Sequence, residues 1–104
     1  MVAEQEEIRC AETFKAIGDR TRLQILRTLL DSEKCVTDLA KSLHTDAPRI
    51  SFHLARLKFA GLVVDQRQGQ RVIYRINPDV LKSAGRGHSV IDIGCCTLDF
   101  ATGK

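Results

Sequence analysis

The sequence lacks the features of a membrane, secreted or catalytic protein. It has no N-terminal apolar segment of signal-peptide type and no hydrophobic run of membrane-span length, so we expect a cytoplasmic protein that does not bind a membrane. It also lacks a Cys-x-x-Cys motif and any recognisable nucleophile–base–orienter set. The histidines His44, His53 and His88 have no metal-ligand spacing with acidic residues. We therefore expect a protein that is not an enzyme.

The chain is short and shows no internal repeat or low-complexity segment. Its 104 residues, 43% of them hydrophobic, are enough for one compact core but not for two. Such a small core is marginally stable alone, and a partner subunit adds buried surface. We therefore expect a single domain that forms a homodimer.

The basic residues are concentrated in one part of the chain. The formal net charge is +3, but residues 49–75 hold six basic side chains against Asp65 alone, whereas residues 1–48 hold seven basic and nine acidic ones. A local positive field is typical of a nucleic-acid contact. The alternative interpretation is an ordinary solvated charged face.

Hydrophobic periodicity predicts two helices in the first third of the chain. The first is expected from about Glu6 to Ile17, ending at Gly18. Asp19 is a suitable N-cap for a second helix, which carries apolar residues at helical spacing: Leu23, Ile25, Leu26, Leu29 and Leu30.

The next segment predicts a helix-turn-helix. Thr37 is expected to cap a short helix, with a turn at residues 44–45. Asp46 then caps a longer helix, in which Pro48 occupies the first turn and which Gly61 ends. The inward stripe of this longer helix is Ile50, Leu54 and Leu57. Its outward face collects Arg49, Phe52, Arg56 and Phe59.

Basic side chains interleaved with aromatic ones suit a DNA groove better than bulk water. For Phe52 and Phe59 the alternative is packing within a dimer, and for Phe59 that alternative is favoured.

A β-hairpin follows the helix-turn-helix. A strand starts at residues 62–64, Gln68-Gly69-Gln70 supplies the turn, and the return strand alternates apolar and basic residues up to Ile76. This hairpin is the wing of a winged helix-turn-helix, and its residues Arg67, Arg71 and Arg75 can reach phosphates or a minor groove.

Beyond the wing we expect a short helix over residues 79–84, a break at residues 85–87 and a strand-like segment at residues 90–93. The predicted fold class is α+β, mainly α with a β-hairpin wing. Residues 1–84 are predicted to form the DNA-binding and dimerisation domain, and residues 85–104 a C-terminal tail that bears a cysteine pair.

Four pieces of sequence resemble one known family when taken in this order and spacing: "DRTRLQIL", "CVTDLA", "SFHLARLKFAGLV" and "RQGQRVIYRI". The segment that contains them covers about two-thirds of the chain and resembles the ArsR/SmtB family of bacterial metal-responsive repressors, of the arsenic-responsive type. The resemblance implies a homodimer that binds a palindromic operator and releases it when an inducer binds.

The sequence departs from the family pattern at the start of the recognition helix. Ala47 and Pro48 stand where many members carry amide or hydroxyl side chains, which shifts base reading toward Arg49, Ser51 and His53. The predicted DNA contacts are Arg49, Ser51, Phe52, His53 and Arg56 on the helix, with Arg67, Gln70 and Arg71 on the wing.

The four cysteines are the candidate inducer ligands, because thiolates select soft or thiophilic ions. Cys95 and Cys96 are adjacent and form the core of the predicted site, and a trivalent arsenic species prefers three sulfurs. Cys10 or Cys35, from the same or the partner subunit, would supply the third. For Cys35 the alternative is a small buried residue, and Cys10 is open to either role.

Other features of the family's metal sites are missing. Family arsenic sensors often carry Cys-x-Cys at the third helix, but Thr37 stands where the second cysteine would be, and no zinc-ligand spacing surrounds His88. No cofactor is expected, and the expected inducer is As(III) or Sb(III). The alternative is a redox or persulfide sensor that uses Cys95 and Cys96.

Overall fold

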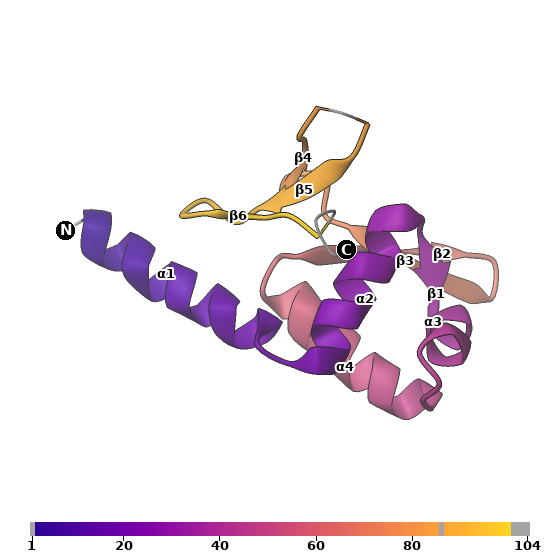
Figure 1. The fold of residues 1–104 in the computed structure, drawn as a ribbon. Helices are drawn as coiled ribbons and strands as arrows, with labels where there is room; N and C mark the ends of the chain where they lie inside the picture. Colours follow the sequence, from indigo (N-terminus) through magenta and orange to yellow (C-terminus); the bar gives the residue numbers. More distant parts are fainter. Residues whose placement is uncertain (1, 86, 101–104) are drawn as a thin grey trace.

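The computed structural model describes residues 2–85 and 87–100. The predictions for Arg86 and residues 101–104, at the break and the end of the tail, lie outside the described residues. The described chain contains four α-helices and two three-stranded antiparallel sheets (Figure 1). The helices are α1 (Val2–Ile17), α2 (Arg20–Asp31), α3 (Val36–Ser42) and α4 (Ala47–Phe59).

The first sheet has the order β1-β3-β2, formed by Lys34–Cys35, Arg71–Ile76 and Val63–Gln68. The second has the order β4-β5-β6, formed by Leu81–Ser83, Ser89–Asp92 and Thr97–Leu98.

Two of the predicted helix caps are confirmed. The Asp19 carboxylate accepts a hydrogen bond from the Arg22 backbone N–H at 3.0 Å, and the Asp46 carboxylate accepts one from the Arg49 N–H at 2.8 Å. The predicted cap at Thr37 is wrong, because α3 begins at Val36 and its N-cap residue makes no side-chain hydrogen bond. That N-cap residue is Cys35, which the short strand β1 holds in extended backbone beside β3.

The predicted inward stripes form the core. The side chains of Ile50, Leu54 and Leu57 on α4 are fully buried, and they pack with buried residues of α2, α3 and the wing: Ile25, Leu26, Leu29, Leu39, Leu62, Val63 and Ile76. Burial of apolar side chains is the main force that holds such a fold together. The outward face of α4 is thereby fixed relative to the wing.

The wing is the β2–β3 hairpin, with Gln68 paired to Arg71 across the predicted turn. Gly69 has φ +65°, a left-handed conformation that suits glycine in a tight turn. Strand β1 has only two residues and was not predicted from the sequence; in it Cys35 pairs with Ile73 of β3.

The C-terminal segment differs most from expectation. The predicted helix over residues 79–84 is wrong, because Leu81–Ser83 form β4, which pairs with β5 in the register Lys82↔Val90. The predicted strand at residues 90–93 corresponds to β5. Ile91 of β5 is fully buried in the same cluster as the helix-turn-helix residues. The predicted division between residues 84 and 85 therefore falls inside a β-hairpin whose second strand packs on the main core.

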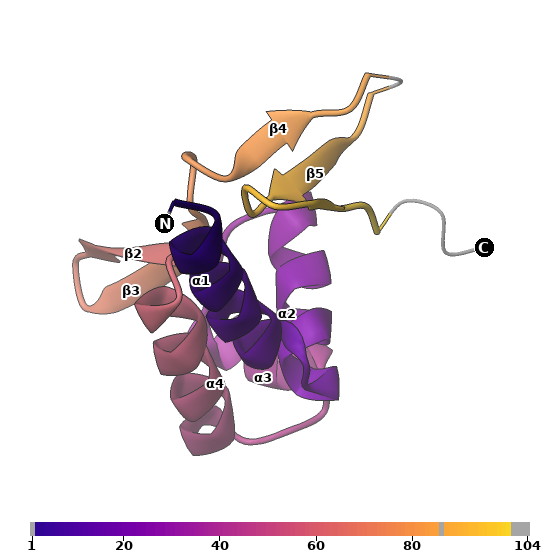
Figure 2. The same cartoon turned by 90° about the vertical axis from the view of Figure 1, so that its left-hand side faces the viewer.

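Helix α1 starts four residues earlier than predicted, and it projects away from the other helices (Figure 1). In both Figure 1 and Figure 2 the turn between β5 and β6 lies beside α1. Within the described ranges, no helix is long and apolar enough to cross a membrane.

Candidate DNA-binding surface and thiol site

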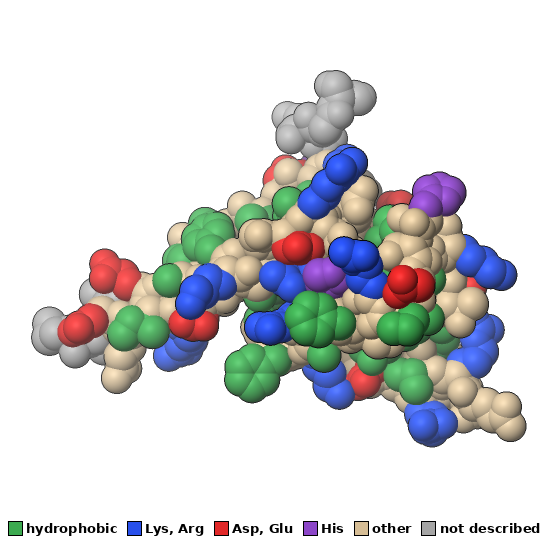
Figure 3. All heavy atoms as spheres, turned by 90° about the horizontal axis from the view of Figure 1, so that it is seen from below, with side chains coloured by type: hydrophobic (Ala, Val, Ile, Leu, Met, Phe, Trp, Pro, Cys, Tyr) green, Lys and Arg blue, Asp and Glu red, His purple; other side chains and the backbone are tan. Residues whose placement is uncertain are grey.

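The exposed side of α4 carries four of the five predicted helix contacts: Arg49, Ser51, Phe52 and Arg56. The Arg56 guanidinium lies 5.1 Å from the centre of the Phe52 ring, a cation–π contact that orients both side chains. Figure 3 views the molecule from the α4 side and shows Lys and Arg side chains around exposed hydrophobic ones. This surface can present positive charge, hydroxyl groups and an aromatic ring to a groove.

The structure does not support the fifth predicted helix contact, His53. Its side chain is 9% exposed and faces the start of α2 rather than solvent. Its Nδ1 atom lies 3.1 Å from Arg22 Nη1 and 3.8 Å from an Asp19 carboxylate oxygen. Burial lowers the pKa of His53, and the nearby Asp19 carboxylate opposes this effect. A side chain that is buried and engaged inside the chain is not available to read bases.

The predicted wing contacts lie at the hairpin turn. Gln70 is exposed, and the Arg67 guanidinium lies 3.5 Å from the Gly69 carbonyl oxygen within the turn. Arg71 reaches back to the helix-turn-helix, where its Nη2 donates to Cys35 Sγ at 2.9 Å and to Asp38 Oδ2 at 3.2 Å. The bond to Cys35, with the charge of Asp38, raises the pKa of Arg71. Arg71 is thus held in place by an internal partner.

The structure places Asp19 and Arg22 next to His53, although the sequence indicates these two residues only as part of the second helix. The backbone N–H of Arg22 holds the pKa of Asp19 below its ordinary value. The Arg22 side chain lies between α1, α2 and α4 because it contacts the Ala16 carbonyl oxygen and His53. The "DRTR" sequence signals a helix cap, but no local pattern indicates that its second arginine meets a histidine 31 residues later.

The thiols are arranged differently from the predicted Cys95–Cys96 pair. Cys95 forms a disulfide with Cys10 of α1, with a Cα–Cα distance of 6.3 Å, and Cys96 beside it is exposed and unbonded. Cys35 is buried at the wing next to Arg71. Among the described residues, no group of three or more His, Cys, Asp or Glu side chains is placed to hold a metal ion. Of the two candidates for a third thiol, Cys10 lies at this site, whereas Cys35 lies in β1 beside strand β3 of the wing.

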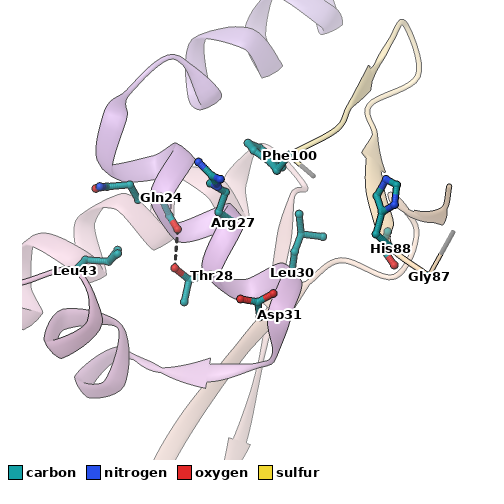
Figure 4. A pocket seen from close by; sticks show the side chains of 10 residues that line it. Gln24, Arg27, Thr28, Leu30, Asp31, Leu43, Gly87, His88 and Phe100 are labelled. Carbon is teal, nitrogen blue, oxygen red and sulfur yellow. Dashed lines mark hydrogen bonds between the residues drawn. The ribbon is translucent and has the colours of Figure 1, made fainter. Parts of the chain in front are cut away.

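Two of the cavities in the described part of the chain lie beside the C-terminal strands. A cavity of about 210 Å³ adjoins the disulfide and is lined by Glu6, Arg9, Cys10, Thr13, Ile93, Gly94 and Cys95. A larger one of about 660 Å³ lies between α2 and the β4–β5 hairpin (Figure 4). Arg27, Asp31 and His88 contribute to its lining, but none of the predicted DNA or thiol residues does. Of these two cavities, the smaller one adjoins the candidate thiol site.

The helix-turn-helix, the wing and the exposed basic face of α4 define a winged helix-turn-helix protein of the DNA-binding class. The bacterial regulatory protein family named arsR matches residues 19–64. The arsenic resistance transcriptional regulator ArsR1 of Pseudomonas putida KT2440 is 44% identical over 70 residues, which cover 64% of this chain and 53% of that protein.

The arsenical resistance operon repressor of Escherichia coli K12 is 43% identical over 70 residues, which cover 66% of this chain and 60% of that protein. The chain therefore spans between half and two-thirds of the length of these two relatives.

A solved structure from Mycobacterium bovis has a TM-score of 0.69 and 33% identity, and covers 73% of this chain and 70% of its own. It is described as the homodimeric winged helix-turn-helix DNA-binding domain of Mb0332, a possible ArsR-family transcriptional regulator. The chain belongs to the ArsR/SmtB family of transcriptional regulators. All three relatives are named as regulators of transcription, in agreement with the expectation that the chain is not an enzyme.

Proposed function

We propose that this chain is a transcriptional repressor that binds duplex operator DNA as a homodimer. The observation that carries the proposal is the exposed row of Arg49, Ser51, Phe52 and Arg56 on a helix whose opposite side is fully buried. A helix anchored in this way can enter a major groove without rearrangement of the core, and its N-terminal residues then meet the base edges.

The wing supplies contacts of a second kind. Arg67 and Arg71 neutralise phosphates beside the site read by α4, while Gln70 at the turn offers an amide to the backbone or the minor groove. These contacts raise affinity for any sequence, whereas Arg49 and Ser51 discriminate between sequences. Because a dimer has two-fold symmetry, the operator is a pseudo-palindrome whose half-sites lie about one helical turn apart.

The dimer is supported by the described state of the Mb0332 domain and by exposed apolar side chains in this chain. Ile8 and Phe14 on α1 are 59% and 46% exposed, and Phe59 at the end of α4 is 96% exposed. Contact with a second copy would remove this apolar surface from water. This role for Phe59 agrees with the dimer-packing alternative that the sequence favoured.

A gel shift with the chain's own promoter region tests DNA binding. We expect a complex that persists in excess shuffled duplex and whose affinity falls linearly with salt on logarithmic axes. Binding that the shuffled duplex competes away equally well would contradict the proposal of a sequence-specific repressor.

We further propose that a thiophilic inducer, As(III) or Sb(III), releases the operator by binding Cys10, Cys95 and Cys96 in their reduced form. The disulfide partners are already close, and Cys96 is the next residue in the chain. The names of the arsenic-resistance relatives support this choice of inducer. An ion that ties β5–β6 to α1 would favour one position of α1, and a coupling of about 1–3 kcal/mol between the two sites is enough for control.

Native mass spectrometry of the reduced protein with arsenite tests this site. We expect one arsenic per subunit in the wild type and in Cys35→Ser, the matched control, because Cys35 lies at the wing. Cys10→Ser, Cys95→Ser and Cys96→Ser should each bind weakly. Undiminished uptake by the last three variants, with loss in Cys35→Ser, would move the site to the wing.

A redox or persulfide sensor is the second candidate function, and the Cys10–Cys95 disulfide favours it. Peroxide would oxidise the two thiols to the disulfide with loss of two electrons and two protons, closing the same connection between α1 and β5–β6 without an ion. Operator release by peroxide or persulfide, with no response to arsenite under reductant, would select this function over the first.

A further inference from the structure

A single guanidinium joins three helices at the base of the recognition helix. Arg22 belongs to α2, its Nε donates to the Ala16 carbonyl oxygen in the last turn of α1, and its Nη1 lies 3.1 Å from His53 Nδ1 on α4. Asp19, the N-cap of α2, lies 3.8 Å from the same His53 nitrogen. The planar fork of arginine allows one side chain to make both directed contacts at once.

The chemistry of the two groups fixes the protonation state of His53. Arginine has donors only, so the nitrogen that faces it must accept. His53 is therefore neutral, with its proton on Nε2. Protonation of Nδ1 would replace the acceptor with a donor and bring two positive charges together.

We propose that the Arg22–His53 hydrogen bond is the positioning contact that sets α4 relative to α1 and α2 for operator binding, and that it holds only while His53 is neutral. His53 then acts through Arg22 and does not itself contact DNA. Because the same guanidinium contacts α1, the helix that carries Cys10, it also gives movements of α1 a direct route to α4. This inference rests on the proposed function of DNA binding.

The charged groups that act on His53 belong to α4 and to α2 with its N-cap residue. The Asp19 carboxylate favours protonation, whereas Arg22, Arg49 and Arg56 oppose it. Burial is the largest effect against protonation, and the pKa of His53 lies below its ordinary value of 6.5. As the pH falls below 6.5, the unfolded chain takes up this proton before the folded one does. The stability that neutral His53 contributes is therefore fully present above pH 6.5. It is lost as the pH falls through the pKa of His53 in the folded protein, and the positioning contact is lost with it.

The test is the operator affinity of the full chain, measured by fluorescence anisotropy between about pH 8 and about pH 5.5, the range in which histidines titrate. We expect the wild type to bind with constant affinity at the upper end and more weakly as His53 protonates. His44→Asn and His88→Asn serve as matched controls for the other histidines and should keep this profile. His53→Asn, whose Oδ1 atom can replace Nδ1 as an acceptor, should lose the pH dependence.

His53→Leu removes the acceptor and should bind the operator roughly 10- to 100-fold more weakly than the wild type at neutral pH. His53→Asn should bind more tightly than His53→Leu, because it restores an acceptor. Arg22→Lys keeps the charge but loses the fork, so its affinity should fall while its salt slope stays unchanged. Because Arg22 is not fully buried, this variant also tests the contact if His53→Leu fails to fold.

The outcomes separate this inference from the proposed function. A wild type that binds no operator at any pH would remove the proposed function itself. The positioning role alone would be overturned if the wild type binds the operator, His53→Leu and Arg22→Lys bind it as tightly as the wild type does, and His53→Asn keeps the pH profile of the wild type. A lower salt slope in Arg22→Lys would instead assign Arg22 to direct phosphate contact and also overturn it.

Discussion

Asp38→Asn should increase affinity for DNA, because Asp38 competes with phosphate for a wing arginine. In the structure Arg71 Nη2 lies 3.2 Å from the Asp38 carboxylate and 2.9 Å from Cys35 Sγ. To bind a phosphate, Arg71 must give up the carboxylate. Asparagine keeps the shape of the side chain at the start of α3 but removes the charge that holds Arg71.

The expected magnitude follows from the exposure of the pair. The Arg71 and Asp38 side chains are 62% and 51% exposed, so solvent screens their attraction. Exposed ion pairs contribute little to binding or stability, so removal of the competing charge should raise the DNA affinity only about 1.4- to 5-fold. Loss of the pair should leave the fold intact.

Fluorescence anisotropy with the operator duplex measures this gain, and Arg71→Ala supplies the matched background. Arg71→Ala alone should weaken binding to all duplexes and reduce the salt slope by about one unit per lost phosphate contact. In the Arg71→Ala background, Asp38→Asn should have little effect on DNA affinity, because the arginine that Asp38 pairs with is absent. An equal gain with and without Arg71 would refute the competition and leave only repulsion between Asp38 and DNA.

Substitutions at three other positions test the DNA-reading helix, the C-terminal strands and the α4 cap. Arg49→Ala should cost about 1–3 kcal/mol in operator binding and relax preference at one base position in a selection experiment, whereas equal weakening on all sequences would make Arg49 a phosphate contact. Ile91→Ala should lower the free energy of unfolding in urea by about 2–5 kcal/mol, because Ile91 is fully buried in the main core. If the C-terminal segment were independent of the main core, Ile91→Ala would leave the free energy of unfolding almost unchanged. Asp46→Ala should cost about 1 kcal/mol of stability through loss of the α4 cap, and Asp46→Asn should retain most of it.

The features that the sequence predicted correctly depend on local signals. The cap at Asp46, the buried stripe of Ile50, Leu54 and Leu57, and the wing turn at Gly69 each follow from residues within a few positions of one another. Periodicity also assigned Arg49, Phe52 and Arg56 to the exposed side of α4. These features cover most of the helix-turn-helix and the wing.

The features that the sequence did not predict depend on distant partners. His53 lies at the edge of the outward face, and its burial results from Arg22 and Asp19, which precede it by more than a helix length. Cys10 and Cys95 are 85 residues apart in the chain. Residues 81–83 form a strand rather than a helix because β5 offers them a partner, and only tertiary structure supplies it.

We propose that thiols on and beside α1 control a DNA-binding surface formed by α4 and the wing. This control is tested most directly by anisotropy of the reduced wild type on its promoter duplex during titration with arsenite, beside the double variant Cys95→Ser/Cys96→Ser. Both proteins should bind the duplex with similar affinity, and arsenite should release it from the wild type alone. Release from the double variant at the same arsenite concentration would contradict the claim.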